Sequence, residues 1–358
     1  MFLNRRALKW SATLVLILST ALLAQKKDDK KQDDKKSEAQ KRDLPEIVKI
    51  MDAAATGQLP NDFGLAWARA DFLKAANNLE YVPFTVQYDA TKVTTPAVAF
   101  YWRVVAQNAG ASATLTLPAA KKDDKDKDKK APPPSKYAYE NLTYITPGGG
   151  AQARLSRPFT VMAGTYDVYV MMREQSSAAK NAAAPKVSVI KQTVTVPDLW
   201  TQDLTTSSVI AASHIEPLSA PLSPNEQLER PYAALGSMEI TPSLDGKFTT
   251  KDELSIFFLI YNAKTDAMNK PDVSVEYNFY SKPAGAPEKF FNKTAVQSLN
   301  ASTLPKEFDM SLGHQLSTGQ GVQLTSFPAG DYRLEVKVTD KLSGKSITRD
   351  VNFSVTAG

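Results

Sequence analysis

The chain of 358 residues contains no cysteine and only two histidines, His214 and His314. Without cysteine the fold has no disulfide, and cysteine-based zinc sites and cysteine nucleophiles are excluded. Neither histidine has a metal-ligand spacing to another one, and a serine nucleophile would need one of them as its base. We therefore expect no catalytic residue, no cofactor-binding residue and no metal-binding residue, and we interpret the protein as a non-enzyme.

Catalysis by two carboxylates is the chemistry that these absences do not exclude, because it leaves no sequence motif. The pair Asp252-Glu253 precedes an expected strand, and we interpret it as turn charge. The Asp runs at 28–34 and 123–128 lack the glycine and the bidentate glutamate of a calcium loop and alternate with lysine. Gly148-Gly149-Gly150 has no following Lys-Ser/Thr, so a turn is expected there and not a phosphate cradle. A carboxylate-based hydrolase stays as a remote alternative.

The net charge of +5 and the pI near 9.0 come from three short segments. Residues 5–9 carry +3, residues 25–43 carry +2 and residues 121–130 carry +2, which leaves −2 for the remainder. In the last two segments the lysines alternate with aspartates. A nucleic-acid binder would carry clustered, unopposed basic residues, so we expect no nucleic-acid partner.

The N-terminus has the pattern of a secretory signal peptide. A basic stretch at 4–9 is followed by an apolar stretch from Trp10 to Leu23, and Ser19, Ala21 and Ala24 offer cleavage options before Gln25. The apolar stretch is shorter than the ~20 residues of a transmembrane helix, so no stable membrane span is expected after cleavage. We expect an exported protein that is periplasmic, envelope-associated or secreted.

Beyond residue 62 the sequence predicts mainly strands. The region 63–88 fits either a β-hairpin turning at Asn77-Asn78 or, through its alanine-rich run, an amphipathic helix; we favour the hairpin. The expected strands are 98–107, 114–117, 137–145, 154–161, 166–173 and 187–196, one short strand at 209–212, and then 238–241, 254–261, 273–280, 289–296, 322–327, 332–339 and 346–355.

This pattern predicts an all-β protein with two tandem antiparallel β-sandwich domains. Leu44 to Ala55 is expected to be a short helix with Pro45 in its first turn. The expected organisation is a signal peptide at 1–24, a disordered Lys/Asp-rich tether at 25–43, a short helical segment at 44–62, a first sandwich at 63–200 with a disordered charged insertion at 119–136, a connecting segment at 201–231 and a second sandwich at 232–358.

The two expected sandwiches resemble each other in sequence at three places, in the same order. The matched stretches are 91–105 with 246–261, 159–170 with 327–336, and 191–196 with 349–355. We interpret them as a tandem repeat.

The second match contains the motif Ala-Gly-x-Tyr, with Tyr166 in one copy and Tyr332 in the other. Glycine allows a sharp corner, and the tyrosine hydroxyl can bond back to the corner backbone. This resembles the tyrosine corner of immunoglobulin-like and fibronectin III-like sandwiches, where Val168 and Leu334 occupy the place of the second disulfide cysteine. The stretch 327–345 is similar to the last strands of such modules in uncharacterised bacterial cell-envelope proteins. The resemblance implies an exported architecture and not an activity.

Beside the remote hydrolase alternative, two interpretations of function remain. The first is a structural or protein-interaction protein of the cell envelope that presents its modules to a protein partner. The alternative is a carbohydrate-binding protein acting at a cell wall or polysaccharide through exposed rings such as Trp102 and Trp200. Packing between modules would explain the consecutive aromatics at 100–102 equally, and we favour that explanation. The Asn-x-Ser/Thr sites at Asn141, Asn292, Asn300 and Asn352 would matter only in a eukaryotic secretory pathway.

Overall fold

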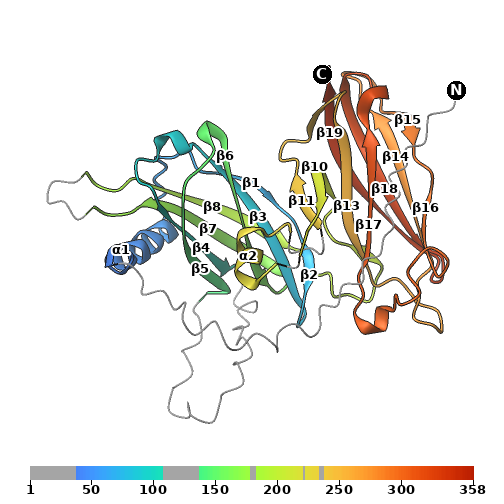
Figure 1. The fold of residues 1–358 in the computed structure, drawn as a ribbon, viewed down its shortest axis with the longest axis horizontal. Coiled ribbons are helices and arrows are strands. Elements are labelled where there is room, and N and C mark those ends of the chain that lie inside the picture. Colours follow the sequence, from blue (N-terminus) through green and yellow to red (C-terminus); the bar gives the residue numbers. More distant parts are fainter. Residues whose placement is uncertain (1–37, 108–136, 178–182, 221, 234–237) are drawn as a thin grey trace, which may run out of the picture. The chain divides into compact units, whose positions relative to one another are not determined.

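The computed structural model describes residues 38–107, 137–177, 183–220, 222–233 and 238–358. Most of these residues lie in strands, and the all-β class expected from the sequence is confirmed. The expected signal peptide, residues 25–37 of the tether, the insertion at 119–136 and the strand at 114–117 lie outside the described residues. Residues 38–43 of the expected disordered tether are helical, so that part of the expectation is wrong. The described chain forms two compact units (Figure 1): an N-terminal unit up to Trp200 that also includes 224–231, and a C-terminal unit of 201–223 and 232–358.

The N-terminal unit consists of two antiparallel sheets packed face to face. In one, β3 pairs with β6 on one side and with β1 and β2 on the other; the second has the order β5-β4-β7-β8. Val82, Phe84, Trp102 and Phe159 are fully buried between the sheets. The strands are β1 (Ala66–Ala70), β2 (Leu73–Ala75), β3 (Leu79–Tyr88), β4 (Val98–Ala106), β5 (Tyr139–Ile145), β6 (Ala153–Val161), β7 (Gly164–Glu174) and β8 (Val187–Val196).

The region 63–88 is strand, as favoured from the sequence, and the helical alternative is wrong. β2 and β3 form an antiparallel hairpin. Asn77 and Asn78 at its turn have φ of 63° and 57°. Asparagine tolerates this left-handed region better than most residues, which explains why the chain turns at this pair.

Helix α1 (Glu38–Ala55) covers the outer face of the β5-β4-β7-β8 sheet. It begins six residues before the expected Leu44, so Pro45 lies inside the helix and not in its first turn. Ile47, Met51 and Ala54 form its buried face. They pack on side chains of β4, β7 and β8: Ala99, Tyr101, Tyr169, Met171 and Val189.

The helix also explains the consecutive aromatics of β4. Phe100 and Trp102 point into the sandwich, whereas Tyr101 points to the side covered by α1. All three are therefore buried inside the N-terminal unit, and the expectation that they pack between modules is wrong.

The C-terminal unit also has two sheets, of orders β11-β10-β13-β17 and β12-β19-β18-β14-β15; β9 pairs with β13 and β16 pairs with β14. Between them lie Phe258, Tyr277, Phe279, Leu334 and Val336. The strands are β9 (Thr205–Thr206), β10 (Ile210–Pro217), β11 (Met238–Pro242), β12 (Lys247–Thr249), β13 (Glu253–Tyr261), β14 (Val273–Ser281), β15 (Lys289–Lys293), β16 (Gln297–Leu299), β17 (Leu316–Gln323), β18 (Gly330–Asp340) and β19 (Lys345–Thr356).

Three boundaries in this half differ from the sequence expectation. The segment 201–231 is not a separate connection. Its strands β9 and β10 pair with β13 of the C-terminal unit. Its last part, 224–231, contains helix α2 (Pro224–Glu229) and belongs to the N-terminal unit. The strand expected at 322–327 is mostly wrong: β17 ends at Gln323 and a 3-10 turn follows. The strand expected at 289–296 ends at Lys293 as β15, and a separate strand, β16, begins at Gln297; the two pair with opposite ends of β14.

The two units share one pairing scheme, but not the one implied by the sequence matches. β3 pairs with β6 as β13 pairs with β17, and β4-β7-β8 are neighbours in the order of β14-β18-β19. The counterpart of β4 is therefore β14, whereas the first sequence match aligned β4 with β13. That match is wrong by one strand, because any long apolar and aromatic run resembles any other buried strand. The second and third matches agree with the pairing scheme.

The tyrosine corner is present in both units. Tyr166 donates its hydroxyl hydrogen to the carbonyl of Met162 at 2.9 Å, and Tyr332 does the same to Pro328 at 2.7 Å. Each bond spans four residues and each ring is buried. Gly164 and Gly330, two residues before each tyrosine, have φ of 155° and 156°. The expected glycine corner with a back-bonded hydroxyl is confirmed in both places.

Candidate functional site

The outer face of the sheet β14-β18-β19 carries an ordered set of polar side chains. Strand alternation points Tyr277, Phe279 and Leu334 inward, so their neighbours along each strand point outward. The register then sets two rows across the three strands. One row is Asn278, Glu335 and Asp350, and the other is Tyr280, Arg333 and Asn352.

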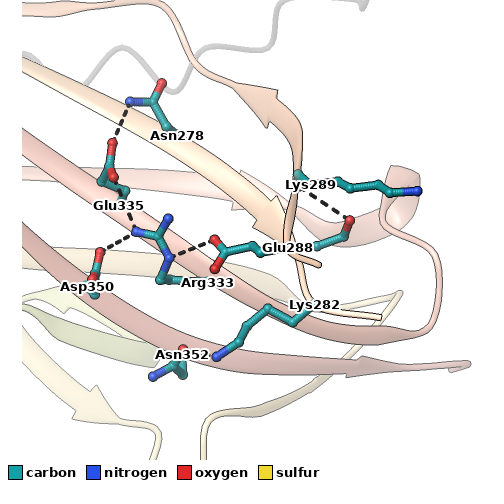
Figure 2. A network of polar contacts seen from close by, with 9 residues as sticks. Asn278, Lys282, Glu288, Lys289, Arg333, Glu335, Asp350 and Asn352 are labelled. Atoms are coloured by element: carbon teal, nitrogen blue, oxygen red, sulfur yellow. Dashed lines mark hydrogen bonds and ion pairs between the residues drawn. The ribbon is translucent and has the colours of Figure 1, made fainter. Parts of the chain in front are cut away.

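Arg333 is the centre of this face (Figure 2). Its Nε donates to Glu288 at 2.7 Å, and its Nη1 donates to Asp350 at 2.6 Å and to Glu335 at 3.2 Å. The amide of Asn278 donates to the second oxygen of Glu335 at 3.3 Å. One guanidinium thus holds three carboxylates from β18, β19 and the segment before β15.

These contacts determine the charge state of Arg333. Partial burial by itself lowers the pKa of the guanidinium, but its hydrogen bonds to Asp350, Glu288 and Glu335 outweigh that and raise the pKa above its ordinary value. Three carboxylates against one cation leave the cluster with negative charge. The face can therefore attract cationic groups while it keeps a fixed arginine at its centre.

An aromatic pair borders the charged cluster. The guanidinium carbon of Arg333 lies 4.4 Å from the ring centre of Tyr280, and the ring of Phe290 meets Tyr280 edge to face at 5.8 Å. Phe290 is 57% exposed, although it is a large apolar side chain. Arginine, tyrosine and phenylalanine are all enriched in protein interfaces, and arginine and tyrosine are among the residue types that most often carry the binding energy.

A cleft of about 500 Å³ opens beside this cluster, at the end of the sheet where β14 ends and β18 begins. Lys282 points into this region and donates to the side chain of Asn352 at 3.1 Å. Both signs of charge line the cleft. Its residues are Asp245, Lys282, Pro283, Ala286, Glu288, Asp331, Tyr332, Asn352, Phe353 and Ser354.

The acidic side chains of this face form one ion-pair cluster with Arg333. Glu288, Glu335 and Asp350 all accept hydrogen bonds from the same guanidinium, which is the arrangement of an ion-pair cluster. In the part of the chain that the structure describes, no three His, Cys, Asp or Glu side chains are placed to hold a metal ion. Within the same residues, no helix combines the length and hydropathy that crossing a membrane requires.

Of the residues singled out in the sequence, Asn352 lies on this face, whereas the candidate catalytic residues lie on other elements. His214 is exposed beside Glu216, and His314 accepts a hydrogen bond from the backbone N–H of Asp309. Asp252 accepts from the backbone and hydroxyl of Thr249 in a turn. Gly149 and Gly150 have positive φ in the turn before β6. None of the contacts described for His214, His314 and Asp252 joins one of these three residues to another.

The two tryptophans of the carbohydrate interpretation are not free rings on a common surface. Trp102 is fully buried, and its indole N–H donates to Pro158 inside the core. Trp200 is 37% exposed, but its indole N–H donates to Leu79 and the ammonium of Lys74 lies 4.6 Å from its ring centre. A sugar contact through Trp102 is therefore wrong.

Sequence reasoning did not identify the Arg333 cluster. A signal was available, since β18 reads Arg-Leu-Glu-Val-Lys, with charges at every second position. Such alternation marks an outward charged face. Which carboxylates join the arginine depends on the register of β18 with β19 and on the turn before β15, neither of which is visible in the sequence.

Comparison with known proteins adds no family. No family model matches the chain, and no curated protein matches it. Among solved structures, trypsin-activated alpha-2-macroglobulin from Escherichia coli is similar over 84% of this chain, at 12% identity and a TM-score of 0.21. This chain covers 17% of that one. A likeness of this size carries no argument about function.

Proposed function

We propose that this protein is a non-enzymatic, exported protein of the cell envelope that binds a protein partner through the charged face of its C-terminal unit. The observation that carries the proposal is the exposed ring of Phe290 next to Tyr280 and the Arg333 cluster, at the edge of a cleft of about 500 Å³. An apolar anchor beside an arginine and surrounded by charges has the composition of an interface centre with its polar rim.

A protein partner fits this face better than a polysaccharide does. Sugar recognition relies on broad rings open on one side, whereas the ring of Tyr280 is covered by Arg333. The negative cluster and Lys282 provide several charge contacts, which favour a partner carrying both signs of charge. A polysaccharide remains the alternative partner, and the experiment below includes it.

The first test concerns the partner. Phe290→Asp places a charge at the proposed anchor and is expected to reduce capture of an envelope partner about ten-fold, the effect of losing a typical hot-spot residue. Met268→Asp is the matched control, because Met268 is 64% exposed and precedes the opposite end of β14. The measurement is quantitative capture from envelope extract, with polysaccharide pelleting in parallel.

Equal capture by both variants, or no partner at all for the wild-type protein, would contradict the proposed face. If the wild-type protein pellets with a polysaccharide and Phe290→Asp does not, the partner of this face is a glycan and not a protein.

The second test concerns localisation. The full chain expressed in a bacterial host is expected in the periplasmic or envelope fraction, and a chain without residues 1–24 in the cytoplasm, because the basic and apolar N-terminus is the export signal. Fractionation with markers for each compartment measures this. Cytoplasmic full-length protein would overturn the exported part of the proposal.

A further inference from the structure

The edge of β8 is an unusually regular one. The strand has ten residues, contains neither proline nor glycine, and pairs with β7 without any register shift. In the sheet order β5-β4-β7-β8 it is the last strand. Proteins normally protect such edges with prolines, bulges, inward-pointing charges or covering segments, because an open edge pairs with other strands.

The first part of this edge is already covered by the chain itself. The backbone N–H of Val189 donates to Pro60 at 2.7 Å, and the N–H of Asp62 donates to the carbonyl of Val187 at 3.2 Å. Asn61 and Ser188 form an isolated antiparallel bridge. The segment 60–62 thus adds a short strand to β8, which shows that this edge accepts strand addition.

These bonds also determine which backbone groups face outward beyond the covered part. Since the C=O of Val187 and the N–H of Val189 both bond to the segment 60–62, strand alternation directs the N–H and C=O groups of Lys191, Thr193 and Thr195 to the same side. All three side chains are exposed. Among the described residues no strand pairs with this stretch. The carbonyl of Thr193 accepts a hydrogen bond from the side-chain amide of the neighbouring Gln192 at 3.1 Å.

The open stretch has defined ends. Segment 60–62 closes it on one side, and Pro197 follows the last residue of β8 on the other. Seven residues, 190–196, lie between. Lys191, the one charge on them, is held by Asp167 at 2.8 Å and so does not block the edge as a free lysine would.

We propose that this stretch of β8 pairs antiparallel with the same stretch of a second copy of the chain. A two-fold axis at Thr193 places Thr193 opposite Thr193 and Lys191 opposite Thr195, so no like charges face each other. Cross-strand threonine pairs stabilise antiparallel sheets, and Thr195 already meets Thr165 of β7 at 3.4 Å. The pairing joins two four-stranded sheets into one continuous sheet, which is an isologous contact that closes at two copies.

This inference goes beyond the proposed function, since it concerns the N-terminal unit and does not involve Phe290. The test is the molar mass of the full chain, measured by light scattering over a concentration series. The wild-type protein is expected to shift from one copy to two. Thr193→Lys puts two lysines opposite each other at the two-fold axis and is expected to remain at one copy throughout the series.

Thr165→Lys is the matched control, because it adds the same charge on the same face but one strand away from the edge; it is expected to form the dimer as the wild-type protein does. Thr193→Pro provides a second variant, since it removes an outward N–H and leaves the bonds to β7 in place.

Hydrogen exchange gives a local readout: the N–H groups of Lys191, Thr193 and Thr195 are expected to become protected as concentration rises. A wild-type protein that stays at one copy up to about 1 mM, the weak end of specific association, overturns the proposal. A Thr193→Lys variant that dimerises like the wild-type protein overturns it as well.

Discussion

At the scale of single residues, the most unusual group in the described chain is the carboxyl of Glu80 in β3. Its side chain is fully buried; one oxygen accepts the backbone N–H of Leu199 at 2.9 Å, and the other has no hydrogen-bond partner. Burial is the main cause that raises the pKa of Glu80 to about 7. The hydrogen bond from Leu199 and the charge of Lys74 lower this pKa, and the charge of Asp198 raises it further. A buried ionised oxygen without a partner is costly, so the protonated form is favoured in the folded protein.

This raised pKa predicts how stability depends on pH. Between the ordinary value of 4.5 and about 7, folded Glu80 keeps a proton that the unfolded chain releases. The free energy of unfolding from this group therefore falls as pH rises through that window, by at most about 1.4 kcal/mol per pH unit. Glu80→Gln, which cannot ionise, is expected to flatten that decline and to be more stable than the wild-type protein at pH 8.

Urea denaturation at pH 5, 6, 7 and 8 measures the free energy of unfolding of both proteins across this window. Glu276→Gln is the control, because Glu276 lies on the outer face of β14 with Lys337 at 3.5 Å. Parallel pH profiles for the wild-type protein and Glu80→Gln would contradict the assignment.

At the scale of elements, α1 is the part that distinguishes the N-terminal unit from a plain two-sheet sandwich. It covers an apolar sheet face, and two ion pairs attach it: Asp43 to Arg173 at 3.2 Å and Asp52 to Arg103 at 2.9 Å. Asp43, Arg103 and Arg173 are all nearly inaccessible to solvent. Removing one partner from such a pair leaves a buried charge, so these contacts make the position of the helix specific.

Truncation of the buried face of α1 is expected to destabilise the N-terminal unit. Met51 is 1% exposed, and Met51→Ala should reduce the free energy of unfolding by roughly 2–5 kcal/mol through lost packing. Val48 lies on the same helix but is 40% exposed, so Val48→Ala should change it by less than about 0.5 kcal/mol. Urea midpoints followed by tryptophan fluorescence compare the two. Similar losses for both variants would show that the helix does not pack as described.

The strands illustrate which elements sequence patterns can predict. β8 was predicted with its observed bounds, because Val187–Val196 is rich in β-branched residues and is followed by Pro197. β17 was misplaced, because its sequence Leu-Ser-Thr-Gly-Gln-Gly-Val-Gln contains two glycines and little apolar surface. Its pairing with β13 along the whole length of β17 supplies the stability that its own residues lack.

At the scale of the whole molecule, each unit has its own core of buried side chains. Units with separate cores can unfold in separate transitions. In a chain without residues 1–24, and hence without Trp10, tryptophan is a selective probe, because Trp67, Trp102 and Trp200 belong to the N-terminal unit and none occurs from 201 to 358. Tryptophan fluorescence therefore reports the N-terminal unit, whereas circular dichroism reports both.

Phe327→Ala is expected to destabilise only the C-terminal unit. Phe327 is 2% exposed and packs on Phe279, Tyr332 and Phe353, so its truncation should cost roughly 3–5 kcal/mol. The dichroism transition should move to lower urea concentration while the fluorescence transition stays in place. Phe84→Ala, at a fully buried site of the N-terminal unit, should move the fluorescence transition. Equal movement of both transitions by Phe327→Ala would show that the units unfold together.

The sequence by itself determined the all-β class, most strand positions and the two tyrosine corners, because these depend on local patterns: alternation, turn residues and a glycine two positions before a tyrosine. It could not determine which strands pair, where α1 packs, or that Trp102 is a core residue, because these depend on contacts between residues far apart in the chain. The same reason explains the Arg333 cluster and the orphaned oxygen of Glu80. Charges on one strand are visible in the sequence, but their partners and their burial are decided only when the sheets pack and the register brings distant side chains together.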